Sequence, residues 1–160
     1  MIKEFVASNT NKDLVIITNV EHNKFYDALA QQTRFENDRR IKFVGTVYDQ
    51  ELLKKIREEA YGYLHGHEVG GTNPSLLEAL ASTRLNLLLG VGFNREVGED
   101  STLYWSKEAG SLSTLLEQAD ALNADAIAEL DRKSTERVRD AYSWEKIVDA
   151  YEKVFVENEK

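Results

Sequence analysis

The sequence contains no cysteine, and this absence excludes disulfide bonds, thiolate metal sites and cysteine nucleophiles. It also lacks any run of about 18 apolar residues, so no transmembrane helix is predicted. No signal-peptide pattern opens the chain. Basic residues are too few to balance the acidic ones, and the net charge of −8 repels nucleic acid and anionic membrane surfaces. We therefore expect a cytoplasmic protein that does not bind nucleic acid.

Proline is nearly absent as well. The one proline, Pro74, stands in a glycine-bearing segment. In a chain otherwise free of proline, this placement indicates a specific role for the residue in that segment. A length of 160 residues and a hydrophobic content of 42% are sufficient for one sizeable core. We predict a single domain over residues 1–160, without an internal repeat or linker.

Short apolar runs alternate with amphipathic stretches along the chain. Continuous apolar runs are typical of parallel strands that are covered on both faces. Their alternation with helices predicts βαβ units, and hence an α/β fold with a parallel sheet and helices on both faces. Residues 2–6 resemble the end of a helix already under way. The expected strands are 13–19, 41–45, 61–65, 85–89 and 102–105, and the expected helices are 23–33, 49–60, 74–82, 112–120, 124–140 and 144–156.

Two of these helices carry apolar stripes that we expect to be buried. In the helix after Asp49 the stripe is Leu52, Leu53 and Ile56. The stripe of the last helix is predicted to pack within the domain, and its aromatic content leaves docking onto another domain as the alternative. Its members are Trp144, Ile147, Val148, Tyr151, Val154 and Phe155.

Residues 65–79, HGHEVGGTNPSLLEA, form the most informative segment. Two adjacent glycines are followed by Asn73, which can cap a helix that begins at Pro74. Backbone N–H groups at the N-terminus of a helix bind anions, phosphates above all. The loop exceeds the usual βα connection of about 2–6 residues, which favours a ligand site over a purely structural turn. We predict a phosphate site beside sugar hydroxyls, with Glu78 accepting hydrogen bonds from a polyol.

Other polar residues flank this loop. His65 and His67 share one face of a strand, but apart from Glu68 no third metal ligand is near, so we expect no metal site. Contact with a ligand phosphate or sugar hydroxyl, and a structural hydrogen bond to the backbone, remain the alternatives for these histidines. Glu68 and Glu78 are candidates for acid–base chemistry. Residues 93–97 follow the fourth strand and either contact the same ligand or form an ordinary loop.

Residues 40–49, 63–81, 92–97 and 141–145 together resemble a known family. The chain is similar to the C-terminal domain of a GT-B-fold retaining glycosyltransferase of the sucrose-synthase-like group, and in particular to bacterial rhamnosyltransferases that build cell-surface polysaccharides. The resemblance implies a Rossmann-like half of the GT-B fold and a hexosyltransferase activity. It also implies a nucleotide-sugar donor, dTDP-rhamnose, a saccharide or lipid-linked acceptor, and no cofactor.

The same resemblance implies roles for individual residues. Glu78 matches the second of two glutamates that contact the donor in this group, while Gly70 stands where the first would fall and Glu68 lies two positions earlier. Glu96 matches a recurrent acidic position after the next strand. Glu78 and His67 are the expected catalytic residues. The expected substrate-binding residues are Gly45, His65, Gly70, Gly71, Thr72, Asn73, Ser75, Leu76, Glu78 and Glu96.

The chain departs from the family pattern at its start. The first strand and its basic loop are missing, and so is the N-terminal acceptor domain, which would be the partner of this one. The resemblance therefore implies the donor half of a two-domain enzyme, inactive alone and situated at the inner face of the membrane when complete. A missing strand would expose a sheet edge and allow self-association. The alternative reading is a non-catalytic nucleotide-binding or flavodoxin-like regulatory module. A receiver of that kind would need clustered acidic residues after the first strand. The residues found there are Thr18 and Asn19, which counts against this alternative.

Overall fold

The computed structural model describes residues 1–158, and the chain forms two compact units. Unit 1 comprises residues 1–56 and 104–123, and unit 2 comprises residues 57–103 and the chain from 124 onward. The elements in chain order are α1 (Ile2–Ala7), β1 (Leu14–Ile16), α2 (Lys24–Thr33), the 3-10 helix η1 (Phe35–Asn37), β2 (Ile41–Phe43), α3 (Gln50–Glu59), β3 (Tyr63–His65), α4 (Pro74–Ser82), β4 (Asn86–Leu89), α5 (Gly92–Gly98), β5 (Leu103–Trp105), α6 (Ser111–Asp120), α7 (Ala124–Tyr142) and α8 (Trp144–Asn158).

The expected α/β class is confirmed, with parallel strands and flanking helices. The strands belong to two sheets. β1 pairs in parallel with β2, and the second sheet has the order β3-β4-β5 with β3 and β4 parallel. The expected helices over 23–33, 49–60, 74–82 and 112–120 are present within one or two residues at each end. No helix in the described part of the chain has both the length and the apolar character needed to cross a membrane.

In unit 1, Arg40 ties the end of α1 to β2. Its guanidinium donates to the carbonyls of Ser8 at 3.0 Å and Thr10 at 2.6 Å, and it pairs with Asp38 at 2.6 Å. The same group lies 5.0 Å from the centre of the Phe5 ring, a cation–π geometry. This arginine therefore satisfies carbonyls of the segment that follows α1, and at 3.4 Å it also reaches the Val6 carbonyl in the last turn of the helix.

The N-terminus of α6 is capped by a side chain of another helix in unit 1. The carboxylate of Glu4 in α1 accepts from the backbone N–H of Gly110 at 2.9 Å, just before α6 begins. A carboxylate at this place neutralises the partial positive charge of the helix end. A cavity of about 460 Å³ lies beside it, and its lining includes Tyr104, Glu108 and Gln118.

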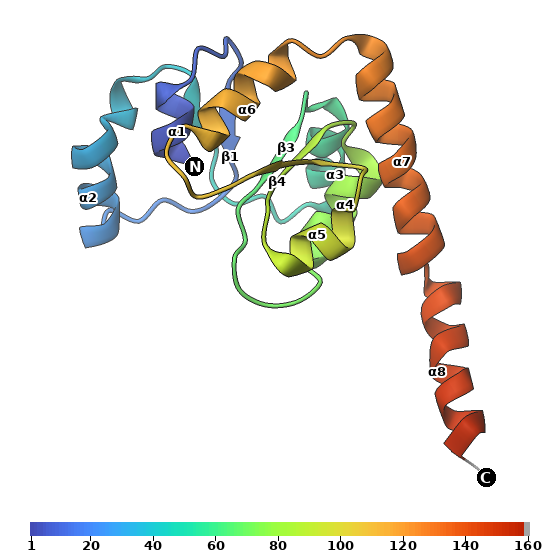
Figure 1. Ribbon diagram of the computed structural model, residues 1–160. Coiled ribbons are helices and arrows are strands. Elements are labelled where there is room, and N and C mark those ends of the chain that lie inside the picture. Colours follow the sequence, from blue (N-terminus) through green and yellow to red (C-terminus); the bar gives the residue numbers. More distant parts are fainter. Residues whose placement is uncertain (159–160) are drawn as a thin grey trace. The chain divides into compact units, whose positions relative to one another are not determined.

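Unit 2 buries a leucine-rich core between its strands and helices. All four residues of β4 are buried, and α4 contributes a face of Leu76, Ala79 and Leu80 with no exposed surface. Each fully buried leucine is worth about 1.5–3 kcal/mol relative to an exposed one. In Figure 1, α4 and α5 lie beside the strands of this unit, and α7 runs along α4.

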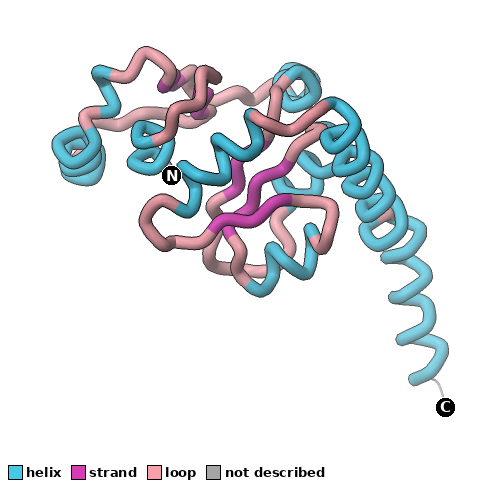
Figure 2. Tube along the Cα trace, turned by 45° about the horizontal axis from the view of Figure 1, so that its top comes forward, coloured by secondary structure: helices cyan, strands magenta, loops and turns pink. Residues whose placement is uncertain are grey.

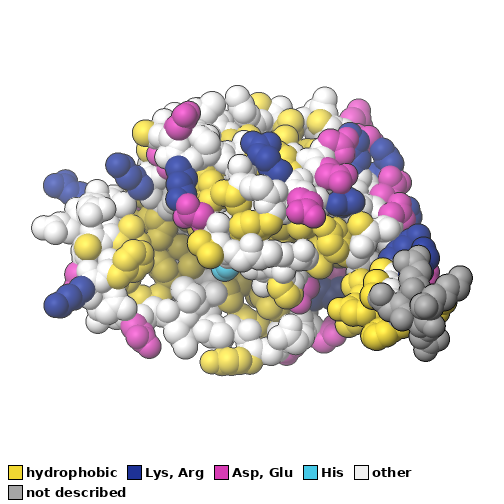
Figure 3. Space-filling view, turned by 60° about the horizontal axis from the view of Figure 1, so that its bottom comes forward, with side chains coloured by type: hydrophobic (Ala, Val, Ile, Leu, Met, Phe, Trp, Pro, Cys, Tyr) yellow, Lys and Arg dark blue, Asp and Glu magenta, His cyan; other side chains and the backbone are white. Residues whose placement is uncertain are grey.

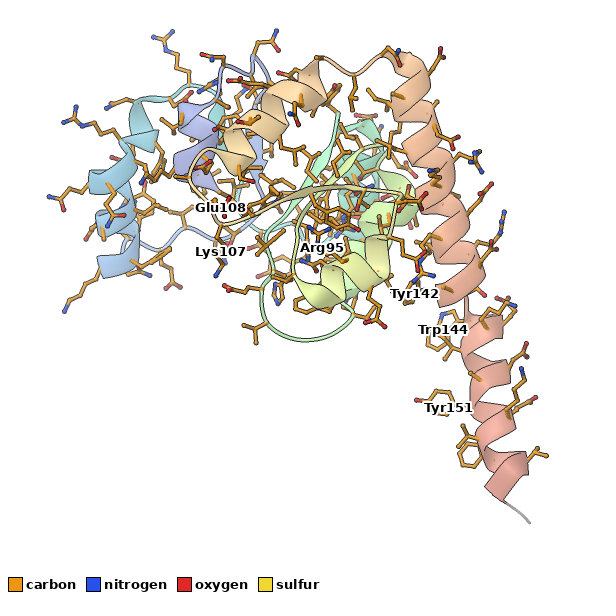
Figure 4. All side chains as sticks on the ribbon, viewed as in Figure 1. Arg95, Lys107, Glu108, Tyr142, Trp144 and Tyr151 are labelled. Carbon is orange, nitrogen blue, oxygen red and sulfur yellow. The ribbon has the colours of Figure 1, made fainter. Side chains whose placement is uncertain are left out.

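The structure overturns two burial predictions. Leu52 is 48% exposed, and α3 has no buried residue. The apolar stripe of α8 is exposed too, except for the half-buried Ile147, with Trp144 at 77% and Phe155 at 67%. α8 continues from α7 and leads away from β3 and β4 (Figures 1 and 2), so little of unit 2 can cover it. Hydrophobic side chains accordingly gather on its surface in Figure 3, and Trp144 and Tyr151 project from the same side in Figure 4.

Candidate functional site

The loop between β3 and α4 is open and rich in unused donors. Gly70 has a φ of +122°, a conformation that L side chains rarely adopt. A Cβ atom added at Gly70 or Gly71 would meet nothing within 4 Å. Within residues 1–158, the backbone N–H groups of Gly70, Gly71 and Thr72 have no hydrogen-bond acceptor in the protein. The loop therefore presents N–H donors to solvent at the carboxyl end of a parallel strand.

The expected cap of α4 is confirmed. The Asn73 side chain accepts from the Ser75 N–H at 2.9 Å, and Pro74 occupies the first helical position. The Leu76 N–H donates to the Asn73 carbonyl at 3.0 Å, and the Leu76 side chain is fully buried. The donors available to an anion are therefore those of the loop, because the first amides of the helix are already occupied.

Glu78 stands on α4 opposite the buried face and pairs with Arg57 of α3 at 2.7 Å. Its side chain is 50% exposed, whereas that of Arg57 is only 12% exposed. Burial raises the pKa of the neighbouring Tyr63 phenol, with opposing effects from the charges of Arg57 and Glu78. Sequence reasoning missed Arg57, because one arginine in a helix with many charged residues carries no signal of its own.

The two histidines were expected on one face of a strand, but β3 ends at His65 and His67 lies in the loop beyond it. Their rings stack with centroids 5.9 Å apart, and the His65 ring lies 5.8 Å from that of Tyr63. His65 is 4% exposed, and its Nε2 has no partner among the described residues, whereas His67 is exposed. Burial, together with the charge of His67, lowers the pKa of His65. Of the two, His67 is the one that a ligand in solvent can reach.

Residues 92–98, expected in part as a loop, form the short helix α5. No capping side chain precedes this helix, since Val91 stands at its N-cap without a side-chain hydrogen bond. Asn94 is fully buried and donates to the carbonyls of His67 at 3.0 Å and Leu89 at 2.9 Å. Glu96 is exposed, and its backbone carbonyl accepts from Arg137 of α7 at 2.8 Å. Figure 4 shows Arg95 on the same helix.

The predicted site residues therefore divide by unit. Gly45 follows β2 in unit 1, with a φ of +78°, and its role stays a prediction. The remaining candidates all lie in unit 2, on or beside the loop between β3 and α4 and on α5. They are His65, His67, Gly70, Gly71, Thr72, Asn73, Ser75, Leu76, Glu78 and Glu96.

Comparison with known proteins shows the fold of the chain. No protein-family model matches it, and no curated protein matches it in sequence. Sucrose-phosphate synthase from Thermosynechococcus elongatus has a similar structure, with a TM-score of 0.71 and 20% identity over 98% of this chain. A glycosyltransferase from Rickettsia africae gives a TM-score of 0.74 and 11% identity, also over 98% of this chain. The chain has the Rossmann-like α/β fold of a GT-B half. It spans 42% of the length of each of these proteins.

Proposed function

We propose that this chain is the donor-binding half of a retaining glycosyltransferase, which holds a nucleotide sugar while the sugar passes to a cell-surface polysaccharide or lipid-linked acceptor. The observation that carries the proposal is the open glycine loop with unused N–H donors at the carboxyl end of β3. Ligands of parallel α/β sheets bind in this position. The likeness in fold to a sucrose-phosphate synthase and to a glycosyltransferase supports the choice of reaction.

The loop would bind the diphosphate of the donor. N–H groups of Gly70, Gly71 and Thr72 would donate to phosphate oxygens, in front of a helix whose dipole favours negative charge there. Departure of the nucleoside diphosphate increases the negative charge on these oxygens. Fixed N–H donors form stronger hydrogen bonds to these oxygens as the charge develops, and this lowers the barrier of the transfer step.

Glu78 would accept hydrogen bonds from hydroxyls of the nucleotide's sugar. Its half-exposed carboxylate is available to a ligand, while the ion pair with Arg57 fixes its direction. His67, exposed at the start of the loop, would contact the donor from the other side of the glycines. His65 would support His67 from beneath through ring stacking.

The acceptor would be bound elsewhere. The chain corresponds to 42% of two larger proteins, and we propose that the acceptor site belongs to a further domain. On this proposal the 160 residues bind donor but do not transfer sugar alone, and the complete enzyme works in the cytoplasm at the inner face of the membrane. dTDP-rhamnose is the first donor to test.

Calorimetric titration of the chain with dTDP, UDP and GDP tests the proposal. We expect one nucleotide diphosphate, dTDP first, to bind at one site per chain. Glu78→Ala should weaken binding about tenfold, the value of one charge-assisted hydrogen bond. Gly70→Ala should weaken it as well, because the new side chain disfavours a φ of +122°.

Glu145→Ala is the matched control, since this glutamate is exposed at the start of α8. Its affinity should equal that of the wild type. Absence of binding by all three nucleotides at millimolar concentration would contradict the donor-site proposal. Sugar transfer by the isolated chain would contradict the assignment of the acceptor site to another domain.

A further inference from the structure

Asn94 connects the glycine loop to the strands of unit 2. Its side-chain NH₂ donates to the Leu89 carbonyl at the end of β4, at 2.9 Å, and to the His67 carbonyl in the loop, at 3.0 Å. Carbonyl oxygens only accept, so the amide group that faces them must be the NH₂. Both of its donors are therefore used, one on each of two neighbouring strand ends.

The loop leaves β3 as an exposed stretch of backbone. Residues 67–72 are exposed, and the glycines in the middle carry no side chain that could pack. At the far end Asn73 caps α4, which is a local contact. The bond from Asn94 to the His67 carbonyl spans 27 residues of sequence and fixes the peptide from which the loop departs.

We propose that Asn94 is a positioning residue that orders the glycine loop and so sets the affinity of the loop for a diphosphate. This inference rests on the proposed donor site. Asn94 has no exposed surface, so it cannot touch a ligand in solvent and acts through the loop. Its Oδ1 is also buried and has no partner among the described residues. An ordered loop binds more tightly, since less conformational entropy is lost when the ligand arrives.

Asn86 provides a matched control within the same unit. It is also fully buried, its side-chain NH₂ also donates to a carbonyl, that of Thr83 at 2.8 Å, and its Oδ1 is also unpaired. It stands at the amino end of β4, however, whereas Asn94 follows the carboxyl end. Removing either amide costs stability, but of the two asparagines it is Asn94 that contacts the loop.

The experiment compares Asn94→Ala and Asn86→Ala with the wild type. Backbone ¹⁵N order parameters of the free protein report loop order, and calorimetry with dTDP reports affinity. In the wild type the Glu68 N–H, which shares a peptide plane with the His67 carbonyl, should have an order parameter near 0.85, about the value of rigid backbone. Asn94→Ala should lower it below about 0.6 and weaken dTDP binding about fivefold or more. Asn86→Ala should change neither loop order nor affinity beyond about twofold.

Three results would overturn the inference. The first is an unchanged loop in Asn94→Ala, the second is equal loss of affinity in both variants, and the third is a mobile Glu68 N–H in the wild type. If Asn94→Ala does not fold, Asn94→Ser retains one donor and should show an intermediate loss of loop order. Failure of the wild type to bind any nucleotide would contradict the donor site alone, because the order parameters test the role of Asn94 without ligand.

Discussion

Arg57 and Glu78 form an ion pair at 2.7 Å whose members are unequally exposed, the arginine 12% and the glutamate 50%. Water reaches little of the Arg57 side chain, so removal of Glu78 would leave the guanidinium charge poorly compensated. Removal of Arg57 would cost Glu78 less, because its carboxylate is half exposed to water. The pair joins α3 to α4 and directs the carboxylate that we assign to the donor.

Glu78→Gln should therefore lower the free energy of unfolding by about 1 kcal/mol, because the less exposed Arg57 loses its charged partner. Chemical denaturation measures this change. Glu96→Gln, a substitution at an exposed position of α5, should have an effect below about 0.5 kcal/mol. Equal effects of the two substitutions would show that the ion pair adds nothing to stability.

Arg137 fastens α7 to the end of α5. Its guanidinium donates to the carbonyls of Glu96 at 2.8 Å and Val97 at 3.2 Å, and it pairs with Glu99 at 3.0 Å. We expect Arg137→Ala to cost about 1–3 kcal/mol, since helix-end carbonyls then lose their donors. Arg139→Ala removes an exposed ion pair and should cost less than about 0.5 kcal/mol by the same denaturation assay. The reverse ranking would place the stabilising contacts elsewhere on α7.

Stability should fall on mild acidification because of His65. Its pKa is lowered in the folded protein, so below pH 6.5 the unfolded chain binds more protons than the folded one. The stability that the neutral imidazole contributes is complete above pH 6.5 and is lost as the pH falls toward the folded pKa. Denaturation at a series of pH values should show this loss, and His65→Gln should reduce its slope.

His22→Gln is the control for this titration, because His22 lies in unit 1 and is exposed. It should leave the pH profile as in the wild type. A slope that persists unchanged in His65→Gln would assign the acid sensitivity to other groups.

The exposed stripe of α8 predicts tolerance to substitution. Tyr151 is 64% exposed and Phe155 67%, so replacing either by Gln should change the free energy of unfolding by less than about 0.5 kcal/mol. Leu80→Ala, in the fully buried face of α4, should lower the free energy of unfolding by about 2–5 kcal/mol. It serves as the reference for the loss of a buried side chain. A loss above 1 kcal/mol at Tyr151 would mean that the stripe is covered in solution.

Much of the fold was predictable because local signals and tertiary structure agree. Asn73 and Pro74 specified the start of α4, and the apolar runs marked β3 and β4. α5 was missed because it begins at Gly92 without a capping side chain. The stripes of α3 and α8 were wrongly expected to be buried, since an apolar face in a sequence does not state what covers it.

The candidate site was predictable only in its local part. The glycine loop and the Asn73 cap can be read from consecutive residues, whereas the Arg57–Glu78 pair joins residues 21 positions apart without any distinctive spacing. The link from Asn94 to the His67 carbonyl depends on how two strand ends come together. Such contacts arise from the tertiary fold, and no local pattern in a single sequence predicts them.

Asn94 also has a consequence for the register of β4 on β3. Three of the four residues of β4 are leucine and all four are buried, so apolar contact alone discriminates poorly between neighbouring registers. The bond from Asn94 to the His67 carbonyl joins the segment that follows β4 to the segment that follows β3, and it can form only when the two strands are correctly aligned. One buried amide thus helps to specify the alignment of a repetitive apolar strand and, with it, the point from which the glycine loop starts.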